Sequence, residues 1–151
     1  MSETAGMTLI STIVKKINGF DSANVKVAEW GILNSGAARV YAIIRPGPAT
    51  RPRASFGVRE NNYQTVIEVW YRFIDDGSSV TGLLGYVDLV AAEVDKYPEL
   101  GDATGTIRRS AEAAGLGEMS EQWRENGDGP SWLKRDVMVN WTQESEVTYA
   151  E

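Results

Sequence analysis

The 151-residue sequence contains neither cysteine nor histidine. Disulfide bonds, thiol chemistry, Cys/His zinc sites and imidazole general bases are therefore excluded, because no other side chain replaces these groups. The sequence also lacks a run of 18 apolar residues, so we expect no segment that spans a membrane. The first residues are acidic rather than basic before a short apolar stretch, the reverse of a secretory signal, which indicates an intracellular product.

Common enzyme signatures are missing as well. The sequence has no G-x-x-x-x-G-K-[ST] loop, no G-x-G-x-x-G after a strand and no G-x-S-x-G elbow. The acidic pair Asp75-Asp76 and the sequence ENGDG at 125–129 are better explained as turns than as a carboxylate site or a calcium loop. No nucleophile, base and orienting group can be named together. We therefore predict a protein that is not an enzyme and binds no cofactor and no metal.

Apolar periodicity predicts two helices, at 8–17 and 80–96. In the first, Ile10, Ile13, Val14 and Ile17 fall on one stripe. The predicted strands are 37–45, which Pro46 should end, then 63–74, 106–114 and 132–142, with a further short strand at 24–30 and an edge strand or short helix within 115–131. This order predicts an α+β two-layer sandwich, in which a mainly antiparallel four-stranded sheet carries both helices on one face. We expect a single domain over 1–151, with a structured core at about 8–142 and an acidic tail at 143–151.

The strand at 63–74 has two different faces. Thr65, Ile67, Val69, Tyr71 and Phe73 suit a core, while the alternate residues mix Trp70 with charged side chains. A mixed face of this kind is expected where a sheet meets a partner. It is equally consistent with a half-exposed strand that carries one stray tryptophan.

Charge is distributed unevenly along the chain. Residues 39–59 contain five arginines and no acid, and residues 75–102 contain seven acids and one lysine. The basic segment includes a Pro- and Gly-rich connection at 46–62, and a loop of this length is usually either functional or disordered. Either both segments are simply solvated, or they match each other between copies of the same protein. The net charge of −6 argues against a dedicated nucleic-acid binder.

The order of these elements resembles a known family. An amphipathic helix, a strand, a long Arg/Pro-rich loop, the strand TVIEVWYRF, an acidic helix and the strand WLKRDVMVNW are similar to the tail terminator, or tail completion, proteins of long-tailed bacteriophages. The resemblance covers about residues 9–142 and is one of element order and size, because the family has no catalytic motif. It implies a structural protein of the virion that is made in the host cytoplasm and forms a ring, expected to be a hexamer, at the head–tail junction. Such a ring caps the tail tube protein, stops tube growth and offers a surface to a neck protein, while genomic DNA passes through its lumen.

Under this interpretation, contacts to neighbouring subunits or rings would be made by Arg45, Arg51, Arg53 and Arg59, with Trp70 and Trp123 as apolar anchors and Asp88, Glu93 and Asp95 as the matching acidic surface. Two alternatives remain open. The chain could be a head–tail joining protein from the other side of the same junction. It could also be a small α+β domain that binds an apolar ligand or acts as an enzyme.

Overall fold

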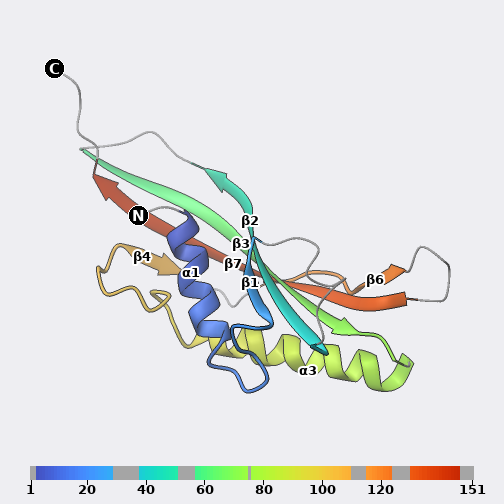
Figure 1. Ribbon diagram of the computed structural model, residues 1–151. Coiled ribbons are helices and arrows are strands. Elements are labelled where there is room, and N and C mark those ends of the chain that lie inside the picture. Colours follow the sequence, from blue (N-terminus) through green and yellow to red (C-terminus); the bar gives the residue numbers. More distant parts are fainter. Residues whose placement is uncertain are drawn as a thin grey trace.

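The computed structural model describes residues 3–28, 38–50, 57–74, 76–109, 115–123 and 130–146. The elements are α1 (Glu3–Val14), β1 (Val25–Val27), β2 (Val40–Thr50), β3 (Val58–Arg72), α3 (Asp76–Asp95), β4 (Ile107–Arg109), β5 (Gly115–Leu116), β6 (Ser120–Trp123) and β7 (Pro130–Glu146). Both helices pack on one face of a mixed, mostly antiparallel open sheet (Figure 1). The α+β class and the placement of the helices are therefore as predicted.

The sheet has more strands than the four predicted. Its path is β1-β2-β3-β7-β4, with β1 parallel to β2 and the remaining pairs antiparallel. Two very short strands, β5 and β6, also pair with β7. The connection at 115–131 was expected to hold at most one extra element. Strands of two to four residues are too short to show a period-2 pattern. The sequence therefore predicts too few strands for the sheet.

The core lies between the helices and the sheet. α1 contributes Met7, Ile10, Ile13 and Val14, and α3 contributes Leu83, Val87, Val90 and Val94. α1 begins five residues earlier than predicted and ends at Val14, because the N–H groups of Lys16 and Ile17 bond three residues back and tighten the chain into a turn. Ile17 nevertheless remains buried against the same core. Within the described residues, neither helix combines the length and apolar character needed to cross a membrane.

Pro46 does not end its strand, contrary to the prediction. The N–H of Ala42 donates to the Asn24 carbonyl, and the Ile44 carbonyl accepts from the N–H of Ala28, so even-numbered residues here direct their backbone groups away from β3. Pro46 continues this alternation opposite Thr65 of β3. Its missing N–H therefore lies on the outer edge of β2, where it removes no ladder bond to β3.

The predicted loop at 46–62 is largely a β-hairpin. β2 continues to Thr50 through a register shift between Pro46 and Ala49, and β3 begins at Val58. The start of the predicted acidic tail also forms strand, because β7 continues to Glu146 beside Val58. We call residues 46–50, 58–64 and 140–146 the arm. The arm extends from the helix-covered part of the sheet, and the N-terminal end of α1 lies at its base (Figure 1).

Candidate interface on the sheet face opposite the helices

The sheet face opposite the helices, here called the far face, carries a second apolar cluster. It consists of Tyr41 and Ile43 from β2, Trp70 from β3 and Trp132 from β7, all at least nine-tenths buried. Tyr41 and Trp132 meet edge to face with ring centroids 5.7 Å apart. The arrangement is a favourable aromatic geometry. Trp70 is therefore part of a cluster rather than a stray exposed ring.

Beside these rings lies an ionic centre built around Glu68, whose side chain is only 6% exposed. Arg45 of β2 forms an ion pair with one carboxylate oxygen at 2.9 Å, and Lys134 of β7 donates to the other at 3.1 Å. The indole N–H of Trp70 donates to Glu68 at 3.2 Å. Lys134 also pairs with Asp136 at 3.3 Å. This Glu68 centre links three neighbouring strands through directional contacts, which a buried carboxylate requires.

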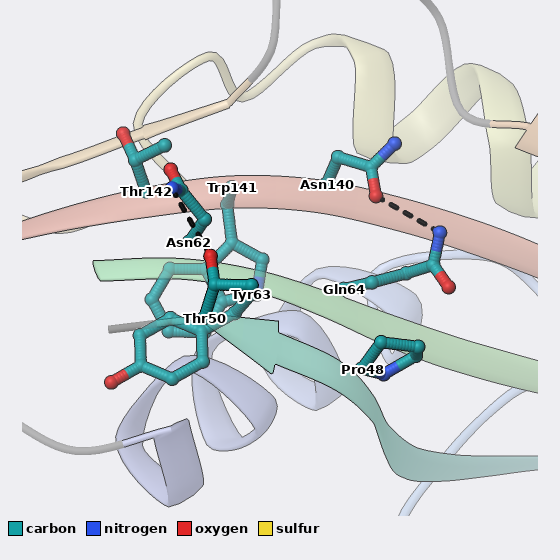
Figure 2. A pocket seen from close by; sticks show the side chains of 8 residues that line it. All are labelled: Pro48, Thr50, Asn62, Tyr63, Gln64, Asn140, Trp141 and Thr142. Atoms are coloured by element: carbon teal, nitrogen blue, oxygen red, sulfur yellow. Dashed lines mark hydrogen bonds between the residues drawn. The ribbon is translucent and has the colours of Figure 1, made fainter. Parts of the chain in front are cut away.

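On the far face, the part of the arm nearest the Glu68 centre carries uncharged polar side chains, whereas Glu60 and Glu144 lie farther along the same face. Gln64 donates to Asn140 at 3.1 Å, and Asn62 donates to Thr50 at 3.3 Å. These residues, with Pro48 and Thr142, line a shallow hollow of about 320 Å³ (Figure 2). Tyr63 and Trp141 also line it, although the Trp141 ring packs against α1 at Gly6. Because no charged side chain lines the hollow, amide and hydroxyl groups are its polar contacts.

Several predicted contact residues are engaged within the chain. Arg45 pairs with Glu68, and Trp70 bonds to the same carboxylate. On α3, Asp95 pairs with Arg109 of β4 at 3.0 Å.

Glu93 is engaged locally on the same helix. It pairs with Lys96 at 2.9 Å. The hydrogen bond and the negative charge of Glu93 raise the pKa of Lys96. Neither residue is therefore a bare charge on the helix surface.

Arg59 and Asp88, unlike the residues above, have no ion-pair partner among the described residues. Arg59 lies on β3 in the arm, and its Nε is buried without a hydrogen-bond partner in the described part of the chain. Asp88 is exposed on α3, and no ion pair involves it among the described residues. Arg51, Arg53 and the side chain of Trp123 lie outside the residues that the structure describes. The structure thus brings Arg45 and Trp70 together and places Arg59 and Asp88 on separate elements.

The sequence interpretation did not single out Glu68, Lys134 or the amides of the arm. The sequence did contain one signal for Glu68. It alternates with core residues along the strand and therefore lies on the same face as Trp70. Its partners come from β2 and β7, and pairing across strands cannot be deduced from a single strand. Within the described residues, no group of acidic side chains is arranged to hold a metal ion.

Comparison with known proteins adds no further assignment. No protein-family model matches the chain, and no curated protein matches it. A function must therefore be inferred from the residues, their geometry and the resemblance in element order.

Proposed function

We propose that this protein is a tail terminator of a long-tailed bacteriophage. In this role it forms a ring on the last ring of the tail tube, stops tube growth and provides the surface to which the neck of the filled head attaches. The ring is expected to be a hexamer with genomic DNA passing through its lumen without sequence-specific binding. The protein would then be located at the head–tail junction of the virion.

The arm is the observation that carries this proposal. The resemblance depends on the order of amphipathic helix, strand, long Arg/Pro-rich loop, strand, acidic helix and last strand; the helices and strands of this order are α1, β2, β3, α3 and β7, and the ends of β2 and β3 that belong to the arm take up much of the predicted loop. The arm consists of three paired strands that extend past the N-terminal end of α1, which packs on the base of the arm at Trp141 (Figure 1). Strands that project beyond their own core supply surface for contacts with other subunits, which a ring protein needs.

A closed ring also requires two different, complementary surfaces on each subunit. The arm offers one, with Arg59 on its helix side and uncharged polar groups around the hollow on its far face. The outward side of α3 offers the other, with Asp88 beside Leu89, whose side chain is 49% exposed. These two surfaces lie on different elements, as a head-to-tail contact requires.

Deletion of the gene in the phage that encodes the chain tests the proposal. We expect overlong, headless tail tubes in lysates examined by negative-stain electron microscopy, and normal tails when the wild-type chain is supplied from a plasmid. Purified chain should also bind tail tube protein rather than portal or adaptor protein. Tails of normal length that fail to join heads would instead identify a head–tail joining protein and overturn the terminator assignment.

The hollow on the arm gives one specific reason to consider a ligand-binding domain. Its volume of about 320 Å³ is at the lower end of the range for small-molecule pockets. Native mass spectrometry of the purified chain separates the two functions. A series from monomer to hexamer without added mass supports the ring, and a stoichiometric bound small molecule supports the ligand-binding domain.

A further inference from the structure

Arg59 occupies an unusual position for a cation. It lies opposite Ser145 of β7, and its neighbours on the same face of the arm are Asn61 and Gln143, which are 5% and 3% exposed. The acids adjacent to it along the strands, Glu60 and Glu144, pair with each other and therefore point to the opposite face. Glu3, at the N-terminal end of α1 on the helix side of the arm, forms no ion pair among the described residues.

The guanidinium of Arg59 consequently lacks a counter-ion among the described residues, and its Nε is both buried and unbonded. Arg59 as a whole is partly exposed, but a buried polar atom without a partner is unfavourable. An acidic group supplied by another molecule would remove this penalty. The position of Arg59 therefore points to an anionic partner from beyond the described part of the chain.

Asp88 is opposite in charge to Arg59 and likewise has no ion-pair partner among the described residues. It lies on the outward side of α3, where Leu89 is half-exposed beside it. One turn earlier, a side chain at Gly85 would meet nothing within 4 Å, so the helix surface is open there. The other two acids predicted on this helix already have basic partners, Lys96 and Arg109. Asp88 is thus an acid with an adjacent apolar anchor and room for a close approach.

Arg59 and Asp88 of one chain cannot reach each other. The C-terminal end of α3 lies beside Arg109, which pairs with Trp141 at the base of the arm. Asp88 lies seven residues before that end, roughly 10 Å along the helix axis. Ser145, opposite Arg59, lies four residues beyond Trp141, roughly 14 Å along the arm. The arm extends away from α3 (Figure 1), so the two side chains can meet only between different copies.

We propose that Arg59 of one copy forms an ion pair with Asp88 of the next copy, and that Leu89 packs beside this pair. The inference rests on the ring-forming function proposed above, and it identifies the two surfaces that meet. The contact joins different surfaces of identical chains, which is the heterologous geometry that closes into a ring. A partly desolvated charge pair would also set the register between neighbouring subunits.

Charge exchange tests the pair. The variants are Arg59→Asp, Asp88→Arg and the double exchange. The controls are two other exposed charges, with Arg108→Asp on β4 and Glu99→Arg beyond α3. Sedimentation velocity of the full-length chain, over a range of concentrations, measures self-association. We expect each single exchange at the pair to weaken association more than about tenfold, and the double exchange to recover it to within about threefold. The controls should leave association unchanged.

Circular dichroism establishes that each variant is folded. If Arg59→Asp does not fold, Arg59→Gln removes the charge without reversing it. The wild-type association should then weaken as salt is raised, while the association of Arg59→Gln should depend less on salt. A double exchange that associates no better than the single variants would overturn the pair.

The pair and the terminator function can fail separately. If wild-type chains form rings that cap tail tubes and the double exchange gives no rescue, the pair is wrong and the function stands. If the exchange rescues association but the chain binds no tail tube protein, the pair stands and the terminator function is wrong. A wild-type chain that stays monomeric at every concentration, with and without tail tube protein, overturns both.

Discussion

The two faces of β3 are held in place by different forces. On the helix side, Ile67 and Val69 are fully buried in an apolar core that α1 and α3 cover. On the far face, Glu68 is 5% exposed and is held by charged partners from β2 and β7. Apolar burial is non-directional, whereas the Glu68 centre requires particular partners at particular positions. The helix side therefore provides most of the stability, and the far face specifies how the strands pair.

The two faces also depend on each other through strand register. Side chains alternate along a strand, so a slip of one residue would move Glu68 into the apolar core and Ile67 to the far face. The contacts of Glu68 with Arg45 and Lys134 exist in one register only. Substitutions on either face test whether this division between stability and register is correct.

The largest effect is expected on the helix side, at Trp141. Its ring packs against Gly6 of α1 and against Tyr63, and its indole N–H donates to Thr65 at 2.9 Å. We expect Trp141→Ala to lower the free energy of unfolding by about 3–5 kcal/mol. Trp141→Phe should cost clearly less, because it keeps most of the apolar contact. Urea denaturation measures both, and equal losses would mean that the Thr65 hydrogen bond, rather than packing, dominates.

On the far face, Glu68→Gln should lower the free energy of unfolding by about 1–3 kcal/mol, since Arg45 and Lys134 lose the charge that compensates them. Replacement of all three residues together, by Leu at Glu68 and Met at both cations, should restore most of that loss. If the triple variant is as unstable as the single one, the Glu68 centre contributes stability in its own right. The distinction between the two faces would then be lost.

Substitutions at two glycines of α3 compare the side of the helix that faces the sheet with the side that faces outward. A Cβ at Gly82 would lie 2.5 Å from the Tyr71 ring, whereas a Cβ at Gly85 would meet nothing within 4 Å. We expect Gly82→Ala to destabilise the fold by about 1 kcal/mol or more, and Gly85→Ala to stabilise it by about 0.5–1 kcal/mol. Thermal unfolding of the two variants side by side gives the sign of each change. The same sign for both would contradict the inner and outer assignment.

The smallest effect is expected at the sheet edge. Pro46→Ala restores an N–H that points away from β3, so the free energy of unfolding should change by less than about 0.5 kcal/mol. Edge prolines discourage pairing with other strands, so association through the edge should increase slightly. Light scattering at high concentration detects this increase. A large loss of stability would instead show that Pro46 shapes the β2–β3 register shift.

Patterns confined to one element were predictable. The apolar stripes of both helices and the core face of β3 follow from periods of 3.6 and 2 residues, and the structure confirms them. The arm was not recognised, because Pro and Gly normally indicate a loop and only the hydrogen-bond direction of β2 shows why Pro46 is tolerated. The Glu68 centre was missed for a related reason, since its members lie 23 and 66 residues from Glu68 in the sequence.

By itself, the sequence determined the absence of thiol and imidazole chemistry, the class of fold and the face that each long element buries, because composition and periodicity are local properties. Tertiary structure alone decided which charges are neutralised inside the chain and which are not. Arg45 and Asp95 have intrachain partners, whereas Arg59 and Asp88 have none among the described residues. Ion pairing depends on distances of a few ångströms between strands and helices, and only the packed fold establishes these distances.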